Sequence, residues 1–114
     1  MDIKRRTADD AVIVALSGEV DMSTSPEARR TFLELVGKKT PKILVDLSQV
    51  TWMDSSGIAT LVECYKNTRD YGGKLRLFSL NENIKDEFVL TKLDTIFDIK
   101  GSEQEALSTP YAAR

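Results

Sequence analysis

The sequence predicts an α/β domain in which a mixed β-sheet of about four to five strands carries about four helices. Segments with the patterns of strands and of helices alternate along the 114 residues. Residues 42–47 (KILVDL) show little polar alternation, as expected of a strand whose two faces are both covered by helices. The length and a hydrophobic content of 41% suit a modest core, so we expect a single domain over residues 1–114.

The first half of the chain predicts two further strands and a helix. Residues 2–6 (DIKRR) form a weakly supported first strand. Residues 11–18 (AVIVALSG) are an apolar, partly β-branched run that ends at a glycine, which is typical of a buried strand. A helix follows, because Ser25 can cap its start, Pro26 suits the first helical position and Gly37 can end it.

The second half begins with an amphipathic helix and continues with shorter elements. From Gly57, apolar residues recur at helical spacing, so this helix should pack on the sheet through one stripe, formed by Ile58, Leu61, Val62 and Tyr65. The later segments predict a strand nearer the sheet edge at 74–80, a helix at 82–90, a strand at 96–99, and a last helix capped by Ser102. The tail from about residue 110 to 114 is expected to fray.

The charge and the apolar runs exclude two classes of partner. The formal charge is −2, from 16 basic and 18 acidic residues that are interspersed, so we expect no nucleic-acid partner. No apolar run approaches the roughly 18 to 20 residues that span a bilayer, and the N-terminus lacks the apolar centre of a signal peptide. We therefore expect no membrane partner and a cytoplasmic location.

The histidine and cysteine counts exclude several chemistries. Histidine is absent, which removes a Ser-His-Asp triad, a Cys-His pair and any imidazole ligand for zinc. The single Cys64 cannot form an internal disulfide, and it suits a small buried position in the core. We expect no cofactor, no metal and no catalytic residues.

Residues 54–57 (DSSG) lie where a predicted strand ends and a helix begins. A hydroxyl of Ser55 or Ser56 can accept a hydrogen bond from a free N–H of the first helical turn, and plain capping would explain the segment. The same helix start could instead carry a phosphorylated serine, since its free N–H groups and partial positive charge suit a phosphate. The pattern alone leaves both interpretations open.

Three segments resemble a known family. The stretch VDLSQVTWMDSSGIATLV (45–62), with LSGEVDMSTSPE (16–27) and GGKLRLFSL (72–80), is similar to the anti-sigma factor antagonists, which are single-domain STAS proteins. The match extends over nearly the whole chain, in order and with similar spacing. The resemblance implies the STAS-like fold.

The resemblance also implies a partner-switching mechanism. The unphosphorylated protein would bind an anti-sigma factor that is also a GHKL-type serine kinase, and would thereby release a sigma factor for transcription. The kinase would phosphorylate the serine directly after the motif aspartate, which is Ser55, and the phosphorylated form would let go. A PPM-type serine phosphatase would reset the switch. The chain itself would be a binding protein, not an enzyme, and a monomer when free.

Roles for the neighbouring residues follow from the same matching. Ser56 would shape the helix start, and Asp21 would lie near the phosphorylation site in the partner surface. Asp54 would orient the serine or receive a basic side chain of the partner, although either aspartate could equally be a turn former. Gly57 would permit close approach of the partner backbone or fill a tight helix start.

Two features beside the serines bear on the partner. Trp52 could anchor a partner or pack in the core, whereas Met53 suits core packing beneath the helix. Relatives often carry Gly-Leu-Gly after the serines, where this chain has Gly57, Ile58 and Ala59. Alanine stabilises a helix by about 1 kcal/mol relative to glycine, so the start of this helix should be more stable than in those relatives. The difference also affects which partner can bind.

Two other functions remain open at this point. The chain could be a STAS subunit that scaffolds a larger assembly, such as a transporter ATPase complex or a stressosome-like particle, without phosphorylation. It could also bind nucleotide at a helix start, although it has neither a G-x-x-x-x-G-K-[ST] nor a G-x-G-x-x-G segment.

Overall fold

A computed structural model describes residues 1–111, which form a five-stranded sheet with helices on both faces. The strands follow the sheet order β1-β2-β3-β4-β5, and their bounds are β1 Asp2–Ala8, β2 Ala11–Val20, β3 Lys42–Met53, β4 Lys74–Phe78 and β5 Asp98–Lys100. β1 pairs with β2 in the antiparallel direction, and the other three pairs are parallel. The predicted mixed sheet is confirmed.

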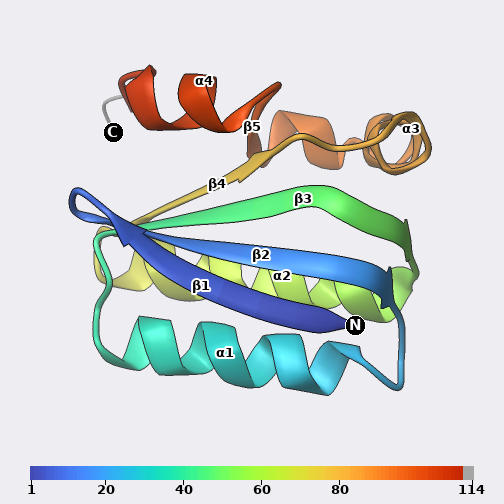
Figure 1. Ribbon diagram of the computed structural model, residues 1–114, viewed down its shortest axis with the longest axis horizontal. Coiled ribbons are helices and arrows are strands. Elements are labelled where there is room, and N and C mark those ends of the chain that lie inside the picture. Colours follow the sequence, from blue (N-terminus) through green and yellow to red (C-terminus); the bar gives the residue numbers. More distant parts are fainter. Residues whose placement is uncertain (112–114) are drawn as a thin grey trace.

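Four α-helices and one 3-10 helix connect or follow these strands. Their bounds are α1 Ser25–Gly37, α2 Ser55–Asp70, α3 Glu82–Leu90, η1 Leu93–Thr95 and α4 Glu103–Ser108. Each of α1, α2 and α3 links two parallel strands, whereas α4 comes after the last strand (Figure 1). This is the alternation that the sequence predicted.

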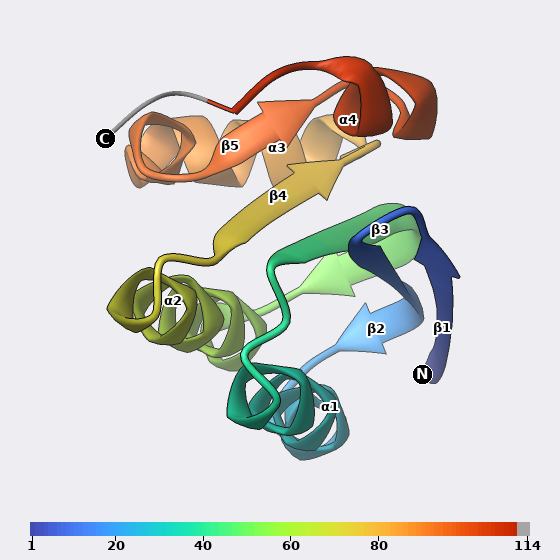
Figure 2. The same ribbon diagram turned by 90° about the vertical axis from the view of Figure 1, so that its left-hand side faces the viewer.

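The helices divide the core into two unequal parts. The main core joins α1, α2 and α3 to one face of the sheet, through residues such as Phe32, Leu61 and Phe88. A smaller second core lies on the other face, beneath α4, and consists of Ala11, Ile13, Leu44, Phe78 and Ala106. Figure 2 shows α1 and α2 together on one side of the sheet and α4 on the opposite side.

Three predicted strands needed correction. β3 does not stop at Leu47 but continues to Met53, because β3 takes up one extra residue at each of two register shifts and keeps pairing with β2 as far as Val20. The strand predicted at 74–80, nearer the sheet edge, is β4, which lies beside the edge strand β5 but is itself an inner strand: it pairs with both β3 and β5 and is buried on both faces from Leu75 to Phe78. The strand predicted at 96–99 is β5, at 98–100, because residues 93–95 form η1 first.

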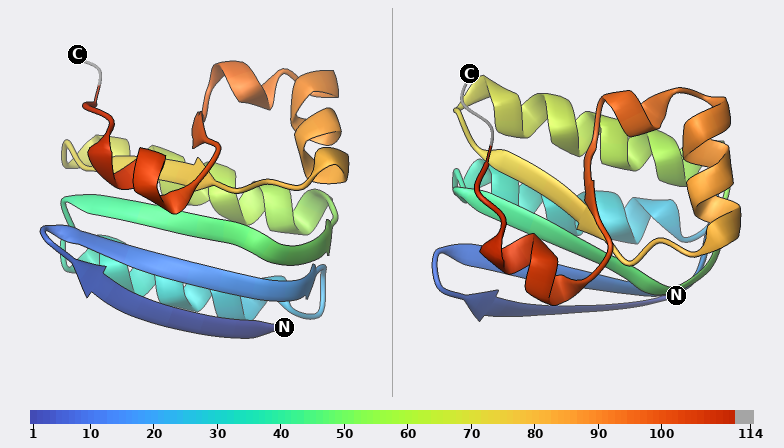
Figure 3. Two further views of the ribbon diagram at one scale, coloured as in Figure 1. Left: turned by 45° about the horizontal axis from the view of Figure 1, so that its top comes forward. Right: turned by 90° about the horizontal axis from the view of Figure 1, so that it is seen from above.

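The end of the chain also differs from the prediction. The tail was expected to fray from residue 110, yet Pro110 and Tyr111 contact the side chain of Arg76, and Tyr111 packs on the second core. Residues 112–114 lie outside the described residues. Figure 3 shows α4 and the segment after it crossing the face of the sheet that α1 and α2 leave open.

Candidate functional site

The candidate site lies where two loops meet at the carboxyl ends of β2 and β3. The backbone N–H of Asp54, directly after β3, donates a hydrogen bond to the carbonyl of Val20, the last residue of β2, over 3.0 Å. This bond holds the turn that contains Asp21 against the start of α2. The sequence-based expectation that the two segments lie close together is therefore confirmed.

Asp54, and not a serine, caps α2. Its Oδ1 accepts hydrogen bonds from the backbone N–H groups of Ser56 and Gly57, at 2.9 and 3.2 Å. The hydroxyl of Ser56 donates to the same oxygen at 2.5 Å. The predicted serine cap is wrong, because the aspartate one residue earlier accepts the hydrogen bonds of these N–H groups, so neither serine hydroxyl is needed as the cap.

Ser55 is the first residue of α2, and its side chain is exposed. No described residue forms a hydrogen bond with its hydroxyl, whereas the hydroxyl of Ser56 is held by Asp54. The two adjacent serines therefore differ: one hydroxyl is accessible and the other is engaged. Asp54 orients Ser56 and does not orient Ser55.

The hydrogen bonds at this helix start stabilise the charged form of Asp54. The hydroxyl of Ser56 is the main cause that lowers the pKa of the Asp54 carboxyl below 3.8, and the backbone N–H groups of Gly57, Ser56 and Met22 add to it. Partial burial acts in the opposite direction. The cap is therefore ionised at neutral pH, and it places a negative charge next to Ser55.

Asp21 forms the turn between β2 and α1. Its Oδ1 accepts hydrogen bonds from the hydroxyl and the backbone N–H of Ser23, at 2.7 and 2.9 Å, and from the backbone N–H of Thr24. These bonds, that of the Ser23 hydroxyl above all, lower the pKa of Asp21 below 3.8. Helix α1 then begins after Thr24, so Ser25 is its first residue and not its cap as predicted.

Gly57 is buried, and its neighbours explain why glycine is needed there. A Cβ atom at this position would lie 2.5 Å from Cγ of Met53, 2.9 Å from Cγ1 of Val20 and 3.0 Å from the Val20 carbonyl oxygen. The glycine lets α2 begin directly against the ends of β2 and β3. Gly57 thus fills a tight helix start, which is one of the two roles expected of it.

Two large apolar side chains are exposed around the site. Trp52 is 51% exposed, while the adjacent Met53 is 1% exposed and belongs to the main core, as predicted. Met22, in the turn after Asp21, is 79% exposed. Met22 was not predicted as a surface residue, because a single methionine in a turn belongs to no hydrophobic period. The one signal in the sequence that could have indicated it is its place directly after Asp21.

A groove of about 550 Å³ continues from Ser55 along the outer surface of α2. Half-buried Ile58 and Val62 contribute its apolar part, and Glu63 and Lys66 are among its polar residues. Exposed Ala59 also lines it, at the position where relatives often carry glycine. The accessible serine therefore lies at one end of a partly apolar surface.

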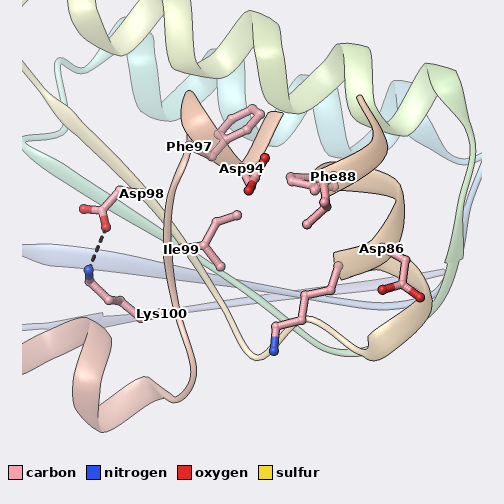
Figure 4. Close-up of a pocket in the computed structure, with 9 residues that line it drawn as sticks. Asp86, Phe88, Asp94, Phe97, Asp98, Ile99 and Lys100 are labelled. Atoms are coloured by element: carbon pink, nitrogen blue, oxygen red, sulfur yellow. Dashed lines mark ion pairs between the residues drawn. The ribbon is translucent and has the colours of Figure 1, made fainter. Parts of the chain in front are cut away.

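A second hollow, of about 460 Å³, contains none of the predicted site residues. It lies between α3, η1 and β5, where Phe88, Phe97 and Ile99 line it beneath charged side chains (Figure 4). Asp98 and Lys100 form an ion pair at its border, at 3.2 Å. Over residues 1–111, no group of three metal-ligating side chains is present and no helix is long and apolar enough to cross a membrane.

Comparisons with known proteins place the chain in a family. A model described as the STAS domain matches residues 2–106. The anti-sigma-B factor antagonist of Listeria monocytogenes is 30% identical over 105 residues, which are 92% of this chain and 91% of that protein. The protein of the same name from Bacillus subtilis is 29% identical over 104 residues, covering 91% and 93% of the two chains.

Solved structures agree with this assignment. A Thermotoga maritima protein, described as a candidate anti-sigma factor antagonist, has a TM-score of 0.88 at 29% identity and covers 92% of this chain and 91% of its own. The Bacillus cell fate determinant SpoIIAA, solved in its phosphorylated form, shares the fold with a TM-score of 0.74 at 18% identity, over 93% and 96% of the two chains. The chain belongs to the STAS domain family.

Proposed function

We propose that this protein is an anti-sigma factor antagonist, which binds an anti-sigma factor in its unphosphorylated form and releases it after phosphorylation of Ser55. Relatives that carry this name match more than nine-tenths of the chain, at 29% to 30% identity. The partner is an anti-sigma factor with GHKL-type serine kinase activity, and a PPM-type phosphatase restores the free hydroxyl. The chain is the substrate of these enzymes and performs no catalysis itself.

The accessible hydroxyl of Ser55 carries this proposal. A kinase must reach the acceptor hydroxyl, remove its proton and join the oxygen to the γ-phosphorus of ATP, with ADP as the leaving group. Ser55 is exposed and its hydroxyl has no hydrogen-bond partner in the described part of the chain, so nothing within the protein competes for the oxygen. Ser56 would first have to give up its bond of 2.5 Å to Asp54.

The added phosphate acts by its charge. A phosphoserine carries about −1.5 to −2 charges at neutral pH. At Ser55 it would lie next to the ionised Asp54 and near the turn that contains Asp21. Asp54 already accepts hydrogen bonds from the backbone N–H groups of Ser56 and Gly57. The phosphate is therefore left without those donors, and it makes an acidic surface more negative without reshaping the helix start.

The surface around Ser55 fits a partner with basic and apolar groups. Asp21 and Asp54 offer carboxylates that can receive a basic side chain. Exposed Trp52 and Met22 supply apolar area, and tryptophan is enriched among residues that dominate binding energy. The basic groups of such a partner would by themselves attract the phosphate. The proposed switch therefore requires that the partner pack closely against the free hydroxyl of Ser55, so that the bulk of the phosphate prevents this packing.

Calorimetric titration with the anti-sigma factor encoded nearest to this protein tests the proposal. Unmodified protein and Ser55→Ala should bind with similar affinity, whereas the phosphorylated protein and Ser55→Glu should bind at least about tenfold more weakly, equivalent to 1.4 kcal/mol. Ser56→Ala is the matched control and should respond to phosphorylation like the wild type. Equal affinity of the phosphorylated and unmodified forms would contradict the switch, and binding to a transporter ATPase alone would favour the scaffold function instead.

A further inference from the structure

A buried arginine holds the end of the chain on the sheet. Arg76, in the middle of β4, is 1% exposed, although a charged residue in a strand is normally expected to face solvent. Its neighbours Leu75 and Leu77 belong to the main core, so Arg76 points to the opposite face, where α4 lies. Arg76 lies within the segment 72–80 that resembles the family, but the resemblance assigns no role to its side chain.

The guanidinium of Arg76 reaches four oxygen atoms. Nε donates to Oδ2 of Asp98 at 2.7 Å, which pairs the charge within the sheet. The remaining bonds go to backbone carbonyls of the chain end: Nη1 to Ala106 at 2.7 Å and to Thr109 at 2.8 Å, and Nη2 to Pro110 at 3.3 Å. One side chain thus fastens three positions of the last described segment.

Aromatic stacking completes the attachment. The guanidinium carbon of Arg76 lies 3.9 Å from the centre of the Tyr111 ring, well within the range of a cation–π contact. The ammonium group of Lys42, at the start of β3, lies 5.4 Å from the same ring. Tyr111 is therefore held from two strands.

Few side chains of α4 itself are buried. Helix α4 has six residues, and Ala106 is its only buried side chain; Leu107 is 42% exposed. An ion pair between Arg6 and Glu103 adds a contact, but both side chains are substantially exposed, and such pairs contribute little. A helix this short is unstable by itself, so its order depends on Arg76 and Tyr111.

The segment nevertheless covers apolar surface. Ile13, Leu44 and Phe78 are at most 1% exposed, and the second core that they form contains Ala106, with Tyr111 packed against it. Removal of residues 103–111 would leave these side chains of β2, β3 and β4 facing water. The segment is a cover for the second face of the sheet.

We propose that residues 103–111, the C-terminal strap, open as one unit while the rest of the fold stays intact, and that Arg76 sets how often they do so. Opening breaks the contacts of Arg76 with the strap and exposes the second core, and hydration of the freed polar groups offsets part of that cost. The main core between the sheet and α1, α2 and α3 stays packed, so opening costs less than global unfolding. The strap therefore belongs to the least stable part of the molecule, and its opening exposes the apolar patch of Ile13, Leu44 and Phe78.

The strap lies at the end of the molecule remote from Ser55. Tyr111 contacts Lys42 at the amino end of β3, whereas Ser55 follows its carboxyl end. Figure 1 shows α4 at the upper left and the start of α2 on the right. Opening of the strap leaves the candidate site in place, so this inference stands independently of the proposed function.

Native-state hydrogen exchange of the full chain tests the proposal. The amides of Ala106 and Thr109, which donate to Ser102 and Glu105, report on the strap, and amides of β2 and β3 report on global unfolding. In the wild type, the strap amides should exchange at least tenfold faster than the strand amides and should respond little to low concentrations of urea. Equal protection with equal urea dependence would overturn the proposal.

Two variants assign the fastening to Arg76. Arg76→Lys keeps the charge but loses the planar fork, so strap exchange should accelerate by a further tenfold while strand exchange changes less than twofold. Tyr111→Ala should also accelerate strap exchange, and it replaces Arg76→Lys as the test variant if Arg76→Lys fails to fold. Arg29→Lys is the matched control, because Arg29 pairs with Glu63 on the surface of α1 and α2, far from the strap. A change in strand and strap exchange by the same factor in both test variants would refute a separate opening.

Discussion

The Asp54 carboxylate accepts a hydrogen bond from the hydroxyl of Ser56 over 2.5 Å, and this contact gives two adjacent serines different roles. Ser56 helps to hold the helix cap in place. Ser55, one residue earlier, keeps an exposed hydroxyl. The chemistry proposed for the site depends on this difference, because a kinase needs an oxygen that the protein does not use itself.

The contact predicts a pH dependence of stability. Since the pKa of Asp54 is lowered in the folded protein, its stabilisation is present above 3.8 and is lost as the pH falls through the lowered value. Ser56→Ala removes the main cause of that shift. Its thermal midpoint should lie below that of the wild type at pH 7, and the two midpoints should converge in acid, as the pH falls through the lowered pKa of Asp54. Ser55→Ala, as the control, should match the wild type at both pH values; a constant deficit of Ser56→Ala across the range would contradict this account.

The tight start of α2 predicts that Gly57 tolerates no side chain. Gly57→Ala places a methyl group within 3.0 Å of Met53 and Val20, and overpacking of this kind typically costs about 1–3 kcal/mol. Urea denaturation gives the free energy of unfolding directly. Gly37→Ala is the control: no atom lies within 4 Å of the added methyl group there, so this variant should be neutral or slightly stabilised. A loss of the same size in both variants would contradict this account, because alanine raises helix propensity at either position and only Gly57 has neighbours that a methyl group would overlap.

Trp52 and Met53 are neighbours with opposite roles. Met53→Ala should lower the free energy of unfolding by about 2–5 kcal/mol, because it empties a buried site in the main core. Trp52→Ala should lower it by at most about 1 kcal/mol and should weaken binding to the anti-sigma factor by about tenfold or more. Denaturation and calorimetry on the two variants separate the effects. Full affinity of Trp52→Ala would remove Trp52 from the partner surface.

The buried thiol of Cys64 should be unreactive in the folded protein. Burial raises the pKa of Cys64 to about 12, and the thiolate is the reactive form. A thiol reagent at pH 8 should therefore label no cysteine under native conditions and the single cysteine in denaturant. Rapid labelling of the folded protein would show that α2 leaves the sheet far more often than this packing allows.

Most of the fold was predictable because its elements have strong local patterns. The apolar runs of β2 and β3 and the amphipathic stripe of α2 identify a sheet with helices packed on it, and each of them is confirmed. The extension of β3 to Met53 was not predictable in the same way. It depends on irregular pairing with β2, which is a property of two strands together.

The errors concern residues whose partners are distant in sequence. Arg76 gave β4 an alternating pattern that suggested an edge, but its charge is neutralised and hydrogen-bonded by Asp98 and by carbonyls 30 or more residues later. The same contacts fix Tyr111, where fraying was expected. Local sequence reasoning assigns a charge to solvent, and only tertiary structure supplies the partners that allow its burial.

At the candidate site, the sequence indicated the right segment but not the division of roles. Residues 54–57 and Asp21 do come together, through the bond between Asp54 and Val20. Whether Asp54 or a serine caps α2 depends on backbone geometry at the strand end, which composition does not determine. Met22 became visible as a surface residue only once the turn after β2 was placed.

The identity of the phosphorylated residue tests the central claim most directly. We would incubate the wild type, Ser55→Ala and Ser56→Ala with ATP, magnesium and the anti-sigma kinase encoded nearest to this protein, and record intact masses. The account predicts the addition of a single phosphate to the wild type and to Ser56→Ala, and none to Ser55→Ala. Phosphate on Ser55→Ala, or none on the wild type while a known antagonist is phosphorylated by its own kinase in parallel, would contradict it.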